Sequence, residues 1–197
     1  MKRSLIIIFI ILLIDQVSKI YIKTHFFMGD EVYVLGNWFI LHFTENPGMA
    51  FGYELGFSWG KLALSSFRIL AIAVLGIYLF TMIKRKASTV FIISLSFIFA
   101  GAIGNMIDSA FYGIIFNESS FYEKAVLFPP EGGYAGFLYG HVVDMLYFPL
   151  FTFNWPEWLP WVGGDSFLFF QPVFNVADSA ITIGVMMILF FQKRIFS

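Results

Sequence analysis

The chain has 197 residues, of which 59% are hydrophobic and only 13% are charged, and its mean hydropathy is +0.80. A soluble domain of this length could not cover its surface with so few charged side chains, so the composition predicts an integral membrane protein. The net charge of −1 gives no indication of nucleic-acid binding, and the lack of cysteine excludes disulfides, a thiol nucleophile and thiolate metal ligands.

Four segments are apolar over about the 20 residues that a membrane-spanning helix requires. They are residues 4–22, 61–83, 88–112 and 172–192. The first could instead be a signal peptide, but no small-x-small cleavage site follows it and charged residues interrupt it, so we expect a retained helix. The sequence therefore predicts an all-α membrane protein, a single membrane-embedded domain over residues 1–197 with four transmembrane helices.

Basic residues gather beside the ends of the predicted helices. Seven of the twelve lie in residues 2–3, 84–86 and 193–194, and none of the thirteen acidic residues lies there. Because short cytoplasmic loops are rich in Lys and Arg, both termini are predicted to be cytoplasmic. Residues 23–60 and 113–171 then form the outer segments.

The outer segments have sequence patterns of their own. The stretch EVYVLGNWFILHFTENPGMAFGYEL, residues 31–55, places β-branched and aromatic residues between Gly, Asn and Pro, which predicts short strands with turns. The aromatic-rich stretch FNWPEWLPWVGGDSFLFF, residues 153–170, predicts an interfacial platform on the outer face. All five tryptophans lie in the outer segments, as expected of aromatic anchors at the headgroup level.

The charged residues within the predicted helices lie at nearly one depth, close to the outer surface. Asp15 and Lys19 occupy the outer half of the first helix, and Arg68 lies about two turns into the second. Asp108 is about one turn below the outer end of the third helix, and Asp178 is predicted between one and two turns into the fourth. Because intramembrane charges face a bundle interior or a water-filled cavity, they predict a functional site at this level.

Each of these residues also has a structural interpretation. Asp15 and Lys19 are spaced i, i+4 in the order that favours an ion pair on one helix. Asp108 could make an interhelical bridge to Arg68 at matching depth. Asp178 could cap the start of the fourth helix, where the helix dipole favours a carboxylate. These alternatives remain open at the level of the sequence.

The residue types leave acid–base chemistry as the main candidate. The histidines lack metal-ligand spacing and the serines lack a Gly-x-Ser-x-Gly pattern, so neither a metal or cofactor nor a serine nucleophile is expected. Asp144 in GHVVDMLYF and Asp178 in FNVADSAI are both placed on the outer face, just before or inside the fourth helix. Two carboxylates brought close together share a proton, so one can deprotonate water while the other donates to a carbonyl. Sequence spacing alone does not show that the two meet.

Five short motifs follow one another along the chain. They are DQVSK (15–19), NPGMAF (46–51), GNMID (104–108), GHVVDM (140–145) and FNVADS (174–179). In this order they resemble the motifs of the lipoprotein signal peptidases, also called signal peptidase II, and they extend from the first predicted helix to the fourth.

The resemblance implies a four-helix aspartyl protease of the bacterial cytoplasmic (inner) membrane, with its active site at the outer face. Its substrates would be diacylglyceryl-modified prolipoproteins, cut just before the lipidated cysteine, and its catalytic pair would be Asp144 and Asp178. Membrane lipid and inhibitors of the globomycin type are further implied partners. The supporting residues that it implies are Asp15, Lys19, Asn46, Gly48, Ala50, Asn105, Asp108, Asn175 and Ala177.

Two features depart from the family's pattern. The family usually has arginine after the GNxxD aspartate, where this chain has Ser109. We hypothesise that Arg68, at similar depth, supplies the missing guanidinium. Residues 112–139 are longer than the family's usual link and are interpreted as an interfacial insertion without an assigned role.

Two other classes of protein explain part of the pattern. A small proton- or cation-coupled transporter would also use intramembrane acids, but its path requires polar residues in the inner half of the membrane. The cytoplasmic halves of the first, second and fourth predicted helices carry no charged residue. A non-enzymatic membrane adaptor would leave the clustered acids unexplained, so the sequence favours the protease.

Overall fold

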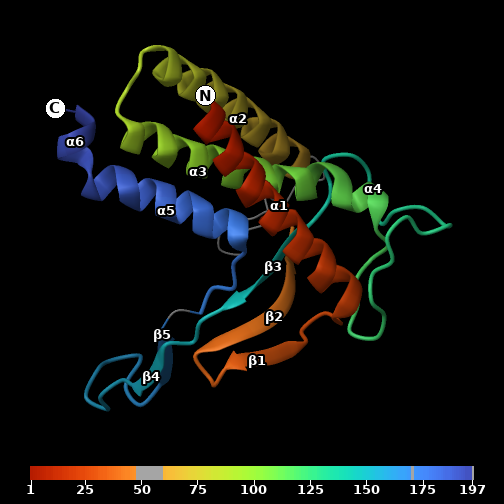
Figure 1. Ribbon diagram of the computed structural model, residues 1–197. Coiled ribbons are helices and arrows are strands. Elements are labelled where there is room, and N and C mark those ends of the chain that lie inside the picture. The colour runs from red at the N-terminus through yellow and green to blue at the C-terminus, as the bar shows by residue number, and fades with distance from the viewer. Residues whose placement is uncertain (48–59, 170, 197) are drawn as a thin grey trace.

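The computed structural model describes residues 1–47, 60–169 and 171–196, with a bundle of helices and strands at one end of it (Figure 1). The helices are α1 (Lys2–His25), α2 (Gly60–Lys84), α3 (Thr89–Ile107), α4 (Gly113–Ile115), α5 (Val176–Phe190) and α6 (Gln192–Phe196), and a π-helical turn (Asp108–Tyr112) joins α3 to α4. The strands are β1 (Glu31–Leu35), β2 (Phe39–Asn46), β3 (Val142–Tyr147), β4 (Phe151–Asn154) and β5 (Ser166–Phe169).

Three helical runs are long and apolar enough to cross a membrane: α1, α2 and the continuous run from α3 to α4. They begin and end within three residues of the predicted segments 4–22, 61–83 and 88–112. Helix α5 is apolar but has only 15 residues, so it is shorter than the predicted fourth segment. The described chain is therefore mainly helical, with three long apolar helices and short strands.

The predicted start of the fourth segment is wrong. Helix α5 begins at Val176, because the preceding Asn175 has an extended backbone and its side chain accepts a hydrogen bond from the N–H of Asp178. Asp178 is the third residue of the helix and lies in its first turn, not between one and two turns into it. Residues 172–175 belong to the predicted segment but precede the helix.

Strands β1, β2 and β3 form one antiparallel sheet in that order, next to the C-terminal end of α1 (Figure 1). The strands predicted within residues 31–55 are confirmed up to Asn46, and the rest of that stretch is described only at Pro47. The prediction that Asp144 lies just before or inside the fourth helix is wrong, because Asp144 is on β3 and pairs with Thr44. Four consecutive residues of β3 are buried, so the strand lacks the alternation by which a half-buried strand is recognised.

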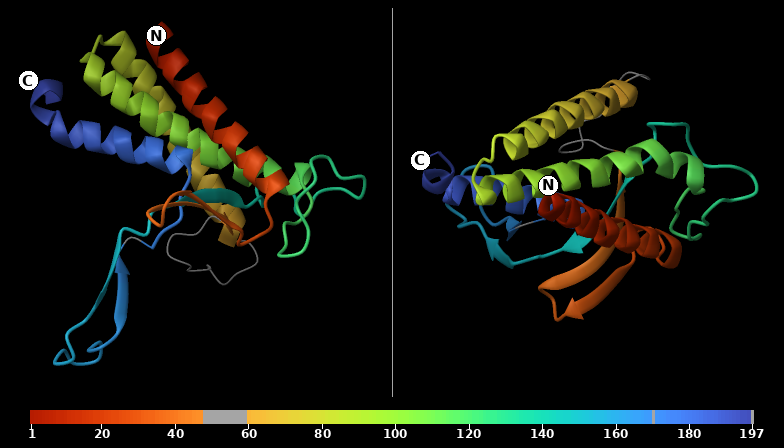
Figure 2. Two further views of the ribbon diagram at one scale, coloured as in Figure 1. Left: turned by 60° about the horizontal axis from the view of Figure 1, so that its bottom comes forward. Right: turned by 45° about the horizontal axis from the view of Figure 1, so that its top comes forward.

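The aromatic-rich stretch 153–170 contains strand structure that the sequence did not predict. Strands β4 and β5 pair as an antiparallel hairpin that extends away from the helices (Figure 2). Aromatic rings stack along it, with the ring centres of Phe151 and Phe169 4.8 Å apart. Its tip is exposed, with Trp158 79% and Trp161 98% accessible.

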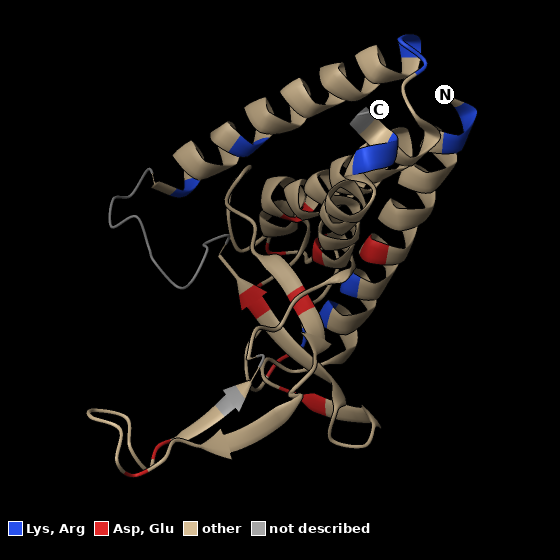
Figure 3. Ribbon diagram, turned by 90° about the vertical axis from the view of Figure 1, so that its left-hand side faces the viewer, with Lys and Arg blue, Asp and Glu red and all other residues tan. Residues whose placement is uncertain are grey.

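One group of basic residues gathers at an end of the helical bundle. Figure 3 shows this group of Lys and Arg near both termini, whereas Asp and Glu lie farther along the bundle and in the strands, together with other Lys and Arg residues. The basic residues of the first group lie in residues 2–3, 84–86 and 193–194. The charge pattern read from the sequence is therefore also a spatial one.

Small residues allow α3 and α5 to approach closely. A Cβ atom on Gly101 would lie 2.2 Å from the carbonyl oxygen of Ala177, and one on Gly184 would lie 2.6 Å from the carbonyl oxygen of Ser94. Contacts this short are forbidden, so both positions require glycine at this helix separation. Close packing of small residues is a general means of helix association in membranes. It places the first turn of α5 directly against α3.

Replacing Gly101 with alanine should separate α3 from α5, because the new methyl group would meet backbone that cannot rotate away. Overpacking of this kind costs about 1 to 3 kcal/mol, so the unfolding temperature in detergent should fall. Gly136→Ala is the matched control, since a Cβ there meets nothing within 4 Å. Equal unfolding temperatures for the two variants would contradict the close packing.

Candidate active site

A buried ammonium group joins helices α1 and α3. Nζ of Lys19 lies 2.9 Å from Oδ2 of Asp15 and 2.8 Å from Oδ2 of Asp108, and all three side chains are fully inaccessible to solvent. The i, i+4 ion pair predicted for Asp15 and Lys19 is therefore confirmed. The bridge from Asp108 that the sequence allowed to Arg68 is made to Lys19 instead.

Asp15 also reaches the start of α5. Its Oδ1 accepts the backbone N–H of Ala177 at 2.8 Å, which satisfies one of the amides that a helix N-terminus leaves without an intrahelical partner. The contact requires Gly104 behind it, because a Cβ at that position would lie 2.7 Å from Oδ2 of Asp15. Asp15 thus bonds α1 to α5 and packs against Gly104 of α3.

Gln16 is a member of this cluster that reasoning from the sequence missed. Its Nε2 donates to Oδ2 of Asp15 at 3.0 Å and to Oδ1 of Asp108 at 2.9 Å, while its Oε1 accepts from the hydroxyl of Tyr112 at 3.2 Å. An uncharged polar residue inside an apolar span was the available clue. Gln16 fills the acceptor sites on both carboxylates that Lys19 alone leaves open.

Lys19 determines which way the amide of Asn105 faces. Nζ of Lys19 can only donate, so the oxygen Oδ1 of Asn105 faces it at 2.9 Å. The nitrogen Nδ2 of Asn105 must then face the other way, where it donates to Oδ1 of Asp178 at 2.7 Å. The buried cation therefore acts on Asp178 through one amide.

Asn175 contacts both predicted catalytic acids. Its Nδ2 donates to Oδ1 of Asp144 at 2.7 Å, and its Oδ1 accepts the backbone N–H of Asp178 at 2.9 Å. The backbone N–H of Asn175 donates in turn to Oδ2 of Asp178 at 3.3 Å, which completes a reciprocal capping box at the start of α5. The prediction that Asp178 caps the helix is therefore confirmed. One carboxyl oxygen of Asp178 makes the cap, and the other accepts from Asn105.

Asp144 has a much less polar environment than its position on a strand would suggest. Only 5% of the residue is accessible, and the side chain of Asn175 donates to it. Burial, together with the nearby carboxylate of Asp178, raises the pKa of Asp144 to about 7. Asp144 therefore carries a proton through most of the range below neutral pH, whereas the N–H donors around Asp178 suit a carboxylate acceptor.

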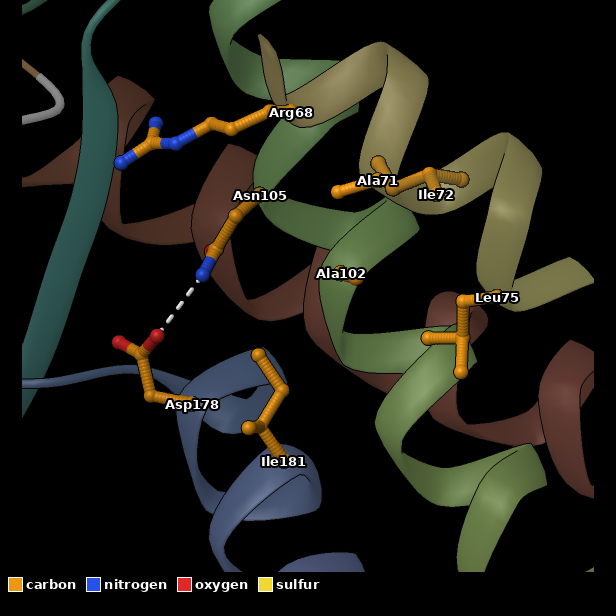
Figure 4. Close-up of a pocket in the computed structure, with 8 residues that line it drawn as sticks. All are labelled: Arg68, Ala71, Ile72, Leu75, Ala102, Asn105, Asp178 and Ile181. Atoms are coloured by element: carbon orange, nitrogen blue, oxygen red, sulfur yellow. Dashed lines mark hydrogen bonds between the residues drawn. The ribbon is translucent and has the colours of Figure 1, made fainter. Parts of the chain in front are cut away.

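A groove lies between α2, α3 and α5, next to Asp178. Its volume is about 330 Å³, and its lining residues are Arg68, Ala71, Ile72, Leu75, Ala102, Asn105, Asp178 and Ile181. Figure 4 shows the polar members, Arg68, Asn105 and Asp178, gathered at one end and the aliphatic members beyond them. The groove thus combines a polar end with an apolar continuation.

The remaining predicted residues are placed as follows. Asn46 ends β2 and pairs with Val142, two residues before Asp144. Gly48 and Ala50 lie outside the described residues. Within the part of the chain that the structure describes, no three His, Asp or Glu residues form a group that could hold a metal ion.

The geometry brings the carboxyl groups of Asp144 and Asp178 to one asparagine, Asn175. Such a pair can accept a proton from water through one member and donate a hydrogen bond through the other. Asn105 on α3 donates to Asp178, and Asn175 at the start of α5 donates to Asp144. Lys19 and Asp15 on α1 in turn bond to Asn105 and to the first turn of α5.

Lys19→Met should be the most damaging single change in the cluster. It would leave two buried carboxylates without their cation, and breaking a buried ion pair costs about 3 to 5 kcal/mol. The unfolding temperature in detergent should fall sharply, and the added change Asp108→Asn should recover part of the loss. Lys193→Met, an exposed lysine near the C-terminus, is the control. A Lys19→Met protein as stable as that control would contradict the role given to the ammonium.

Comparisons with known proteins agree on one family. The family model for signal peptidase (SPase) II matches residues 7–193. A lipoprotein signal peptidase of Porphyromonas gingivalis is 50% identical, over 95% of this chain and 81% of that protein. One of Amoebophilus asiaticus is 39% identical, over 89% of this chain and 71% of that protein.

Solved structures share the fold. A bacterial membrane enzyme superposes with a TM-score of 0.65 at 24% identity, covering 98% of this chain and 89% of the other. A second bacterial membrane enzyme gives a TM-score of 0.63 at 25% identity and covers 98% and 93%. With the family model matching nearly its whole length, the chain belongs to the signal peptidase II family, a family of aspartic proteases.

Proposed function

We propose that this chain removes signal peptides from lipid-modified prolipoproteins, with Asp144 and Asp178 as its catalytic acids. The observation that carries the proposal is the pair of contacts made by Asn175, which donates to Asp144 and caps with Asp178. One buried amide thereby sets the relative position of the two carboxyl groups. Two acids so arranged perform hydrolysis without a metal or a covalent intermediate.

The first step is the attack of water on the scissile carbonyl carbon. Asp178, with N–H donors at both carboxyl oxygens, accepts a proton from the water as the new C–O bond forms. Asp144, whose pKa of about 7 keeps it protonated below neutral pH, donates its proton towards the carbonyl oxygen. The product is a neutral tetrahedral diol. Asp178 is now protonated and Asp144 is now a carboxylate.

The second step breaks the C–N bond. Asp178 returns its proton to the leaving amine nitrogen, and Asp144 recovers a proton from a hydroxyl group of the diol as the new carboxyl group forms. Both acids then have their starting protonation states. Asn175 and Asn105 remain bonded to the pair throughout, so the acids need no rearrangement between the steps.

The groove beside Asp178 is proposed to hold the substrate. Its aliphatic part, with Ile72, Leu75 and Ile181, fits the apolar region of a signal peptide. The scissile bond would then lie at the polar end, beside Asp178. Asn46 at the end of β2 and the motif residues Gly48 and Ala50, which follow it in the chain, are assigned to contacts with the extended substrate backbone.

Charge and hydropathy support a proposed placement in the membrane. We infer four spans within a single domain, with α5 as the fourth, and both termini at the cytoplasmic side of a bacterial inner membrane. The group of basic residues at the end of the bundle near both termini in Figure 3 supports this orientation. The active site would then lie at the outer face, and the aromatic β4–β5 hairpin would lie among lipid headgroups. Inhibitors of the globomycin type are expected to bind at the same site.

Asp144→Asn and Asp178→Asn should each abolish cleavage of a lipidated prolipoprotein while the protein stays folded. Asparagine keeps the shape of the side chain and can cap a helix, but it cannot exchange a proton with water or substrate. The double variant should lose no more activity than either single one, because the two acids act as a unit. Cleavage in detergent and unfolding temperature are the measurements.

Cleavage should also slow down as the pH rises. Since the first step needs Asp144 protonated, kcat/KM should fall as the pH rises through about 7. Asp165→Asn, an exposed acid in the β4–β5 hairpin, is the control and should cleave normally. Cleavage near the parent rate by the Asp178→Asn protein would leave capping as the only role of that residue and refute the pair.

Arg68 is proposed to supply the guanidinium that the family usually has at the position of Ser109. It lines the groove at the same end as Asp178, so its charge can orient a substrate carbonyl beside the acids. Arg68→Ala should lower kcat/KM by about 10- to 100-fold, the range expected when a charged hydrogen bond of about 1.5 to 3 kcal/mol is lost. Arg68→Lys should recover only part of the activity, because an ammonium cannot bond in a bidentate manner. Full activity in both variants would contradict the assignment.

A further inference from the structure

A second polar cluster, centred on the buried side chains of Lys23 and Glu45, lies close to the active site but outside its hydrogen-bond network. We call it the Glu45 cluster, and its members are Lys23, Glu45, Ser119 and His141. Nζ of Lys23 contacts Oε1 of Glu45 and lies 2.8 Å from Oγ of Ser119, and that hydroxyl donates to Oε1 of Glu45 at 2.6 Å. Nδ1 of His141 lies 3.2 Å from Oε2 of Glu45.

These four residues come from four different parts of the chain. Lys23 is on α1, Glu45 is on β2, Ser119 belongs to the insertion, and His141 immediately precedes β3. Lys23 is fully buried, and the side chain of Glu45 is only 4% accessible. Leaving a buried charge without its partners is costly, so the four segments are held in one arrangement.

Aromatic residues of the insertion enclose the same ammonium group. Nζ of Lys23 lies 5.4 Å from the ring centre of Phe116 and 5.1 Å from that of Tyr134. The hydroxyl of Tyr134 also accepts the backbone N–H of His141 at 2.6 Å. The insertion therefore holds His141, the residue directly before β3, in two ways. Tyr134 bonds to its backbone N–H, and Ser119 is connected to its side chain through Glu45.

The segment that joins the insertion to β3 is also fixed along its backbone. Residues 134–141 run beside the end of the third helical run, where the N–H of Gly140 donates to the carbonyl oxygen of Ser109 at 2.9 Å. Nζ of Lys61 on α2 also donates to the carbonyl oxygen of Tyr139 at 2.6 Å. This segment ends directly before β3, whose third residue is Asp144.

The same arrangement connects Glu45 with Asp144 through the sheet. Glu45 pairs with Val143 in the register of β2 and β3, and the N–H of Val143 lies 3.3 Å from Oδ2 of Asp108. Val143 is fully buried and belongs to one apolar cluster with Phe43 and Phe116. A shift at Glu45 would therefore move the backbone next to Asp144.

We propose that Glu45 is a positioning residue, and that the insertion braces the strand carrying Asp144 through Ser119 and Tyr134. The inference rests on the proposed function, since it assigns the brace to the catalytic pair. It gives residues 112–139 a role in the active site although they contribute no catalytic group. Displacements of about 1 Å at a catalytic group can cost about 100-fold in rate, so a small loosening of β3 would be measurable.

The test compares Glu45→Gln and Ser119→Ala with Glu31→Gln. Glu31 is the matched control, because it makes a similar acid–histidine contact on the same sheet, 3.0 Å from Nδ1 of His42, but in an exposed position. Glu45→Gln should lower kcat by about 10-fold or more at temperatures where the protein is fully folded, with KM little changed. Ser119→Ala should act in the same direction but less strongly, and Glu31→Gln should leave both constants unchanged.

Hydrogen–deuterium exchange of residues 142–147 provides a readout that does not depend on activity. The amides of β3 should exchange faster in Glu45→Gln and Ser119→Ala than in the parent and in Glu31→Gln. A lower unfolding temperature with unchanged kcat and unchanged exchange in β3 would assign the cluster a purely structural role and overturn the inference. If the parent cleaves no prolipoprotein, the proposed function fails, and unchanged exchange in β3 would separately overturn the brace.

Discussion

The ammonium group of Lys19 is the point on which the active site depends. It is fully buried and forms ion pairs with both Asp15 and Asp108, which offsets part of the cost of burying the two acids together. Each of these acids uses its remaining bonds for other parts of the fold: Asp15 accepts from the first turn of α5, and Asp108 accepts from β3. The three helices and the strand that carry the site therefore meet at one cation.

Stability and chemistry share the same atoms in this arrangement. Asp178 caps α5 and is also one of the two proposed catalytic acids, so the alternatives that the sequence left open are compatible. A cap needs a fixed side chain with an oxygen facing the helix amides, and a catalytic carboxylate needs the same rigidity. The other oxygen of Asp178 is free of the capping box and accepts from Asn105 at the groove. The capping box at the start of α5 thus fixes the position of the Asp178 carboxyl group.

Much of this could be predicted from local sequence patterns, and the rest depends on contacts between distant segments. Apolar runs identified the three long helices, and the i, i+4 spacing identified the pair Asp15–Lys19. Strand β3 was missed because it is buried on both faces and so lacks alternation.

The contacts of Asn175 with Asp144 and of Lys23 with Glu45 join residues 31 and 22 positions apart in the chain. Such contacts are set by tertiary packing, and no local pattern reports them.

The proposed catalytic pair itself is best tested by following its protons. Infrared difference spectra in detergent would record the protonated carboxyl band as a function of pH, in the parent and in Asp144→Asn and Asp178→Asn. A shared proton predicts that the band of the parent disappears as the pH rises, with a midpoint near pH 7. Neither variant should show a band with this midpoint. Loss of the band near pH 4 in the parent, the value expected of independent carboxyl groups, would contradict the pair.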